Sequence, residues 1–100
     1  MYKIRRVDEN QAALVDAFRK LGVKVLILSE VGNGCPDILC AFPNGRMRLV
    51  EIKDGSKSPS QRKLTQEQVK FHGEWVGYVS VVSSVGEVMK IVREIKNGDI

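Results

Sequence analysis

The chain has 100 residues, of which 43% are hydrophobic and 28% are charged, and its formal net charge is +4. This composition is typical of a folded globular protein and excludes a disordered chain, and the length favours a single domain over residues 1–100. The modest positive charge is compatible with a polyanionic partner. One histidine and two cysteines exclude a disulfide framework and a conventional His-rich zinc site.

The start of the chain does not predict a secretory segment. The basic residues 1–6 are followed by no apolar segment, so we expect no signal peptide. The longest aliphatic run near the start, over 25–28, is far too short to span a bilayer. We therefore expect a soluble protein of the reducing cytoplasm, without a membrane partner.

The first half of the chain predicts one helix and three strands. Apolar residues at helical spacing predict a helix over 8–21, which Asp8 can cap. The β-branched and aliphatic residues 23–28 predict a buried strand. Two further strands are expected over 37–42 and 46–53.

The second half of the chain predicts two helices with a strand between them. Thr65 and Gln68 have the spacing of a capping box, which opens the first of these helices. A strand over 78–82 follows, and Ser84 with Glu87 forms a second such pattern before the last helix. The resulting order, α-β-β-β-α-β-α, predicts an α/β fold in which helices cover both faces of a small mixed sheet.

The turn between the second and third strands determines their register. A two-residue Asn44-Gly45 turn would pair Pro43 with Arg46 where an N–H should bond across the hairpin, and proline has no N–H. We therefore predict a three-residue loop, in which Gly45 is left-handed and Phe42 faces Arg46.

This register predicts a cluster of charged side chains at one end of the sheet. Counting back from the turn places Asp37 opposite Glu51. Because side chains alternate along a strand, Asp37, Glu51 and Lys53 should share one face. The side chain of Ile52 should point to the other face. Two carboxylates and an amine are thus expected to converge.

The chain resembles the PD-(D/E)xK nuclease superfamily in three features: the Pro36-Asp37 pair, the strand residues Glu51-Ile52-Lys53 and the order of the elements. Within it the chain is most similar, over nearly its whole length, to the single-domain VRR-NUC (virus-type replication and repair nuclease) proteins of phages. The resemblance implies a restriction-endonuclease-like core and a DNA endonuclease that depends on Mg²⁺ or Mn²⁺. The segments that carry it are Glu9, Gly34–Asp37, Val50–Lys53 and Leu64-Thr65-Gln66-Glu67-Gln68.

The chemistry of phosphodiester cleavage suits this cluster. The reaction needs a hard cation, and Mg²⁺ takes oxygen ligands and keeps several waters. Asp37 and Glu51 supply two carboxylates, and the resemblance implies that the backbone carbonyl of Ile52 completes the ligands. Lys53 would orient the attacking water, or help to deprotonate it, and steady the phosphate. Singly, Asp37 could instead start a strand after a turn, and Glu51 and Lys53 could lie on a solvated edge.

Four further residues need separate interpretation, and two of them, Glu9 and Gln68, have both a functional and a structural one. The resemblance makes Glu9 a second metal ligand or a water holder, although a carboxylate in a first helical turn also favours the helix dipole. It places Gln68 at the metal site, although Gln68 is also the capping partner of Thr65. His72 follows one turn later, where a structural role is the more common one. We expect Trp75 in the core.

The expected partner is branched DNA. A chain of this length has no room for a separate DNA-recognition domain, so backbone or structure rather than base sequence is the expected target. Lys57, Arg62 and Lys63, in the polar segment 54–63, are either solvated charges or phosphate contacts. The resemblance implies a Holliday-junction resolvase, which acts as a homodimer, in the host-cell cytoplasm if a phage encodes it. A flap or other branched-DNA nuclease and a non-catalytic nucleic-acid-binding module are the alternatives.

Overall fold

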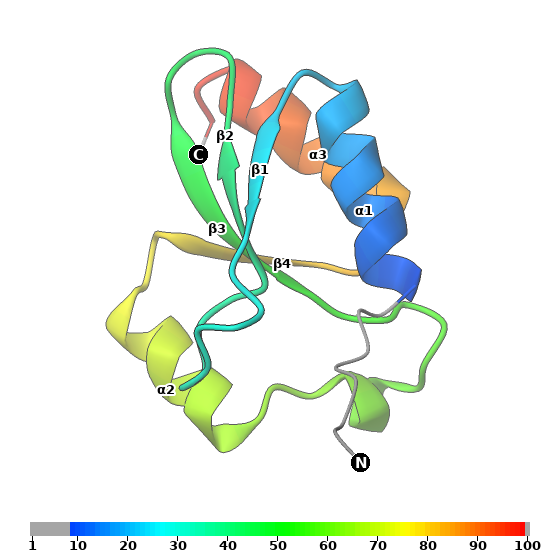
Figure 1. Cartoon of the computed structure of the whole chain (residues 1–100), viewed down its shortest axis with the longest axis vertical. Helices are drawn as coiled ribbons and strands as arrows, with labels where there is room; N and C mark the ends of the chain where they lie inside the picture. Colours follow the sequence, from blue (N-terminus) through cyan, green and yellow to red (C-terminus); the bar gives the residue numbers. More distant parts are fainter. Residues whose placement is uncertain (1–8, 100) are drawn as a thin grey trace.

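The structure is a computed structural model that describes residues 9–99, with Glu9 described through its backbone alone. The Asp8 cap predicted for the first helix lies outside these residues. Within residues 9–99, no helix combines the length and apolar character that crossing a membrane requires. The elements follow the chain (Figure 1) in the order α1 (Glu9–Lys20), β1 (Lys24–Ile27), β2 (Ile38–Ala41), β3 (Met47–Ile52), the 3₁₀ helix η1 (Pro59–Arg62), α2 (Gln66–Glu74), β4 (Val79–Val82) and α3 (Val85–Lys96).

The four strands form one mixed sheet in the order β1-β2-β3-β4. The first three strands are antiparallel neighbours, whereas β4 runs parallel to β3. A parallel pair needs a crossover connection, and the segment between β3 and β4 supplies one that contains η1 and α2. The predicted α/β class with a mixed sheet is therefore confirmed.

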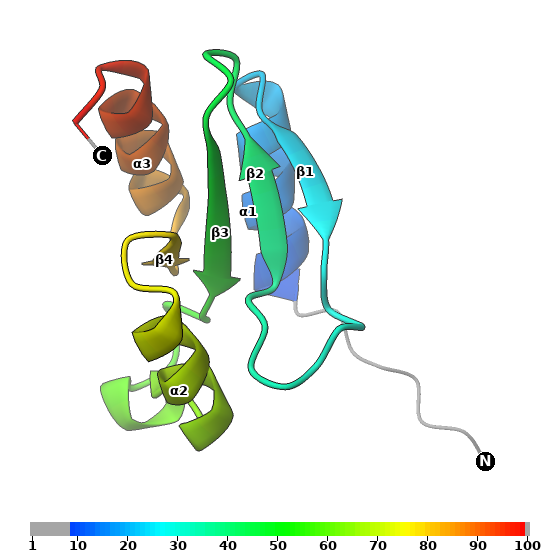
Figure 2. The same ribbon diagram turned by 90° about the vertical axis from the view of Figure 1, so that its left-hand side faces the viewer.

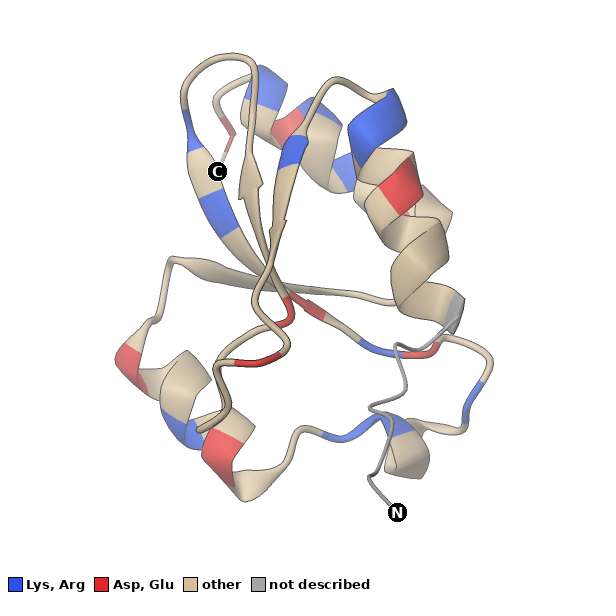
Figure 3. Cartoon of the chain, in the orientation of Figure 1, with Lys and Arg blue, Asp and Glu red and all other residues tan. Residues whose placement is uncertain are grey.

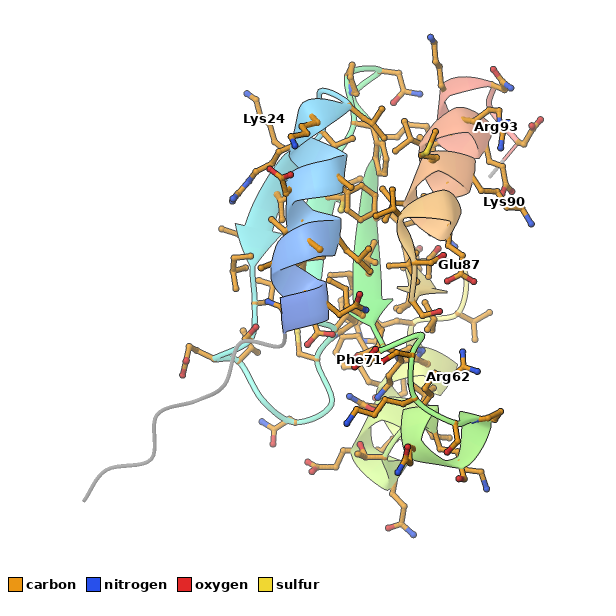
Figure 4. The ribbon with its side chains drawn as sticks, turned by 90° about the vertical axis from the view of Figure 1, so that its right-hand side faces the viewer. Lys24, Arg62, Phe71, Glu87, Lys90 and Arg93 are labelled. Carbon is orange, nitrogen blue, oxygen red and sulfur yellow. The ribbon has the colours of Figure 1, made fainter. Side chains whose placement is uncertain are left out.

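The core lies between one face of the sheet and the helices α1 and α3, which pack side by side on it (Figure 4). Both helices bury apolar residues at three- and four-residue spacing, so one stripe of each faces the strands. The ring of Phe18 meets that of Phe42 edge-on, with centroids 6.4 Å apart. The buried apolar residues are Leu14, Val15, Phe18, Val23, Ile38, Cys40, Phe42, Val50, Ile52, Val82, Val88, Ile91 and Ile95.

The second face of the sheet is largely open, which corrects the expectation of helices on both faces (Figure 2). The helix α2 lies beyond the end of this face and has no buried residue. Leu26 and Val81, whose side chains point to it, are 58% and 46% exposed. The core position expected for Trp75 is likewise wrong, because this residue is 44% exposed. Among the described helices, α1 and α3 both pack on the first face and α2 buries no residue, so none of them covers the second face.

The three-residue turn predicted for the β2–β3 hairpin is confirmed. The backbone N–H of Phe42 donates to the carbonyl of Arg46 at 2.8 Å, and the N–H of Gly45 donates back to Phe42 at 2.9 Å. Gly45 has the left-handed φ of 87° that the loop requires. The ladder of β2 with β3 continues this register, which brings Asp37 opposite Glu51.

Candidate functional site

Two acidic residues meet at the end of the β2–β3 hairpin. The Oδ2 atom of Asp37 accepts a hydrogen bond of 2.7 Å from the backbone N–H of Ile52, which anchors the carboxylate across the two strands. Glu51, on the neighbouring strand, is only 2% exposed. The side chain of Ile52 belongs to the core on the opposite face, as the alternation of the strand predicts.

Burial, the hydrogen bond with Asp37 and the negative charge of Asp37 raise the pKa of Glu51 to about 9, although the charge of Lys53 acts in the opposite direction. A raised pKa of this kind favours the protonated form of Glu51 at neutral pH. Burial and the charges of Glu51 and Asp37 also raise the pKa of the Cys35 thiol, which lies beside them.

The helix α2 brings Gln68 onto this pair. The Gln68 Nε2 atom donates to Glu51 Oε2 at 3.2 Å, and Gln68 Oε1 accepts from Lys53 Nζ at 2.9 Å. The same oxygen accepts from the backbone N–H of Thr65 at 2.9 Å, which completes the predicted capping box. The two interpretations of Gln68 are thus compatible: it caps α2, and it joins Glu51 to Lys53.

His72 also faces the site. Its Nε2 atom lies 3.7 Å from Glu51 Oε1, and among the described residues neither of these buried atoms has a hydrogen-bond partner. Burial, together with the charge of Lys53, lowers the pKa of His72 and so favours the neutral imidazole. Four-residue spacing on a helix places His72 on the same side as Gln68, and this was the signal in the sequence for its position.

The start of α1 lies beside the end of β3. The amide of Asn10 donates to the carbonyl of Lys53 at 2.6 Å and to that of Ser83 at 3.5 Å. Sequence reasoning missed Asn10, because nothing local to it indicates a contact 43 residues away. The side chain of Glu9, the residue before it, lies outside what the structure describes, so its role stays a prediction.

The loop before β2 packs directly on α2 at Gly34. This glycine has a φ of +80°, and a Cβ atom there would overlap the carbonyl oxygen of Glu67 in the first turn of α2. Only a residue without a side chain allows the two backbones to approach so closely. The contact holds α2 next to the strand that carries Asp37.

We expect Gly34→Ala to be more destabilising than Gly32→Ala. Both glycines have a positive φ, but a Cβ atom at Gly32 meets nothing within 4 Å. Gly32→Ala, the control, should therefore lower the free energy of unfolding by about 1 kcal/mol, which is the cost of a left-handed backbone at alanine. Gly34→Ala should lower it by at least ~1 kcal/mol more. Urea unfolding measures both free energies, and equal losses would show that the contact with Glu67 does not matter.

The predicted DNA contacts are not equally accessible. Lys57 and Lys63 are exposed, whereas Arg62 is half-buried and its Nε atom has no hydrogen-bond partner among the described residues. Hydrogen bonds from Ser56, followed by the charges of Lys57 and Arg62, lower the pKa of Asp54. The basic residues of segment 53–63 come directly after the C-terminal end of β3, which is the end at which Glu51 lies (Figure 3).

The described residues contain no group of three or more His, Cys, Asp or Glu side chains arranged to hold a metal ion. The acidic side chains that meet within them are Asp37 and Glu51, and these two, with the Ile52 carbonyl that the resemblance implies, would be the ligands of a cation. The buried Glu51 Oε1 atom without a hydrogen-bond partner fits a cation ligand. Two carboxylates suit Mg²⁺, which keeps several waters. Comparisons with family models, curated proteins and solved structures find no match for the chain.

Proposed function

We propose that this protein is a VRR-NUC-like endonuclease, dependent on Mg²⁺ or Mn²⁺, that hydrolyses phosphodiester bonds in branched DNA, with the four-way (Holliday) junction as its first candidate substrate. The observation that supports this is the meeting of the half-buried Asp37 with the buried Glu51, which is linked through Gln68 to the amine of Lys53. Ionising Glu51 beside Asp37 is costly, as its raised pKa indicates, so a site that binds a cation is the better explanation for the position of the two residues.

Each side chain has a defined task in this proposal. Asp37, Glu51 and the Ile52 carbonyl would hold the cation, which would supply charge neutralisation at the phosphate and an activated water. Gln68 orients Glu51 by its hydrogen bond of 3.2 Å. The Lys53 ammonium, held at 2.9 Å from Gln68, donates to a phosphate oxygen and stabilises the developing negative charge. Glu9 is proposed as a further ligand or water holder at the start of α1.

The proposal is tested with purified protein and Mg²⁺ or Mn²⁺ on four labelled DNAs: a four-way junction, a flap, a linear duplex and a single strand. We expect cleavage of the branched DNAs and none without a divalent cation. Preference for the flap over the junction would support the flap nuclease instead. Binding of all four DNAs without any cleavage would identify a non-catalytic binding module and contradict the proposal.

A four-way junction has two scissile phosphates related by two-fold symmetry, so we propose a homodimer that supplies two sites. Light scattering at high protein concentration, with and without the junction, measures the mass of the particle. If each particle contains only one 11.2 kDa chain, both alone and on the junction, the dimer is contradicted.

Neutralising the exposed basic residues of segment 54–63 should weaken DNA binding on every substrate alike. We expect Lys57→Gln and Lys63→Gln each to reduce the slope of log K against log salt by about 0.9, because each removes one phosphate contact. Arg62→Gln should have a smaller effect, since Arg62 is half-buried. Lys90→Gln, on the outer side of α3 (Figure 4), is the control and should leave the slope unchanged. Unchanged slopes for Lys57 and Lys63 would exclude these contacts.

A further inference from the structure

A groove of about 440 Å³ lies on the open face of the sheet, beside the carboxylate pair. Its floor is aliphatic and comes from β2 and β3, and one wall is aromatic and comes from α2 and the turn before β4. Two of its residues, Met47 and Tyr78, are 66% and 65% exposed. The apolar lining consists mainly of Leu39, Met47, Leu49, Phe71, Trp75 and Tyr78.

The aromatic wall presents free ring surface. Phe71 and Trp75 are stacked, with ring centroids 5.2 Å apart and planes 3° apart. Tyr78 meets Trp75 nearly edge-on, at 6.1 Å and 78°. Trp75 is 44% exposed although it stacks on Phe71, so part of its ring surface is left for a ligand. A flat ring system is the ligand that such a wall stacks with best.

The groove and the carboxylate pair lie next to each other along the same strands. Leu49 lies two positions before Glu51 on the same strand and the same face, which is about 7 Å along β3. Cys35, which also lines the groove, lies two positions before Asp37. Phe71 is the neighbour of His72 on α2. If one part of a ligand lies in the groove, the part attached to it can therefore lie at the carboxylate pair.

The groove has one positively charged residue at its edge. Arg48 is the one charged residue among those that line it. Its guanidinium donates to Ser80 Oγ and to the carbonyl of Gly77, both at 2.7 Å, and these partners are neutral. Within residues 9–99 no ion pair joins Arg48 to a carboxylate, and strand alternation directs its side chain to the face opposite Leu49, so its positive charge lies at the edge of the groove and not on its floor. The ligand that fits is flat, largely apolar and attached to a negative group, which describes a nucleotide.

We propose that this groove binds an unpaired nucleobase next to the phosphate that is cleaved, so that the substrate is DNA with an unpaired nucleotide at or beside a branch. The inference rests on the proposed nuclease function for the identity of the polymer. A base inside a duplex is stacked on both sides and cannot enter the groove without leaving the helix. Fully paired DNA is therefore the poorer ligand.

The test measures binding in EDTA, so it does not depend on cleavage. One probe is a duplex with a single-stranded flap that carries 2-aminopurine at its first unpaired position, and the other is the fully paired duplex. Trp75→Leu and Tyr78→Leu keep an apolar side chain but remove the aromatic ring. Each should lower affinity for the flap at least about 5-fold and for the duplex less than about 2-fold. Binding to the unmodified protein should quench 2-aminopurine fluorescence, and the variants should lose the quenching.

Val76→Ala is the matched control, because Val76 is 75% exposed next to Trp75 but does not line the groove. Equal losses on both probes, or no loss on the flap, would overturn the inference while the nuclease function could still stand. A flap effect in a protein that cleaves nothing with Mg²⁺ would overturn the proposed function alone. Absence of any DNA binding would overturn both. Conversion of a dimer into a monomer by Trp75→Leu would show that a second copy of the chain occupies the groove, which also overturns the inference.

Discussion

Lys53→Ala should lower the rate of DNA cleavage at least ~10²-fold, which is the usual effect of losing a positioned acid–base or electrostatic group. The Lys53 ammonium lies 2.9 Å from Gln68 Oε1 and lowers the pKa of Glu51 through its charge. It therefore lies next to the carboxylate pair, where negative charge would develop in the proposed reaction. Single-turnover cleavage of the best substrate measures the effect, and DNA binding should change much less than the rate.

Lys90→Ala is the matched control for this experiment. Lys90 is exposed on the outer side of α3, away from the open face of the sheet (Figure 4). Its replacement removes one positive charge, as Lys53→Ala does, but far from the carboxylate pair. The control should cleave at the rate of the unmodified protein. If Lys53→Ala also cleaves at that rate, the assignment of Lys53 to catalysis is wrong, and a binding module becomes the better account.

Glu51→Gln should stabilise the protein above neutral pH when divalent cations are absent. The pKa of Glu51 is about 9 in the folded state and 4.5 for an ordinary glutamate, so between these values the folded state binds more protons than the unfolded state. Folding stability should therefore fall as pH rises from about 4.5 to 9, and glutamine abolishes this loss. At pH 8 we expect Glu51→Gln to raise the free energy of unfolding by at least ~1 kcal/mol. Each kcal/mol corresponds to a rise of about 4–8 °C in Tm for a domain of this size.

Thermal unfolding across this pH range measures the difference between Glu51→Gln and the unmodified protein, which should vanish towards pH 4.5. Glu74→Gln, at the exposed end of α2, is the control for removal of one carboxylate. Addition of Mg²⁺ should stabilise the unmodified protein and not Glu51→Gln, because the cation binds only to the folded carboxylate pair. A stability difference that is the same at every pH would show that Glu51 ionises normally.

The sequence was sufficient to predict the geometry of the acidic pair. Pro43 cannot donate the hydrogen bond of a two-residue turn, and this single exclusion determines the register of eight strand residues and brings Asp37 opposite Glu51. The cap of α2 was equally predictable, because Thr65 and Gln68 contact each other within one turn. Local chemistry determines both features, and neither depends on the rest of the fold.

The features that the sequence did not predict depend on contacts between distant segments. Trp75 is apolar and follows a helix, but its exposure depends on whether another element covers the sheet face beside it. Asn10 reaches Lys53 only because α1 folds onto the end of β3. The contact of His72 with Glu51 depends on how the crossover brings α2 back to the end of the sheet. Periodicity identifies apolar and polar faces of an element, and it contains no information about which surface each face meets.

The helix α2, which holds Gln68 and His72 against Glu51, contributes no buried residue to the core. Helices without buried apolar contacts open in local fluctuations that leave the rest of a domain folded, and their amides exchange with solvent faster than those of core elements. The amides of α2 should thus exchange before those of α1 and α3, whose stripes are buried. The fraction of molecules with a complete site at any moment is then set by this local equilibrium, and the global stability of the domain is a poor guide to it.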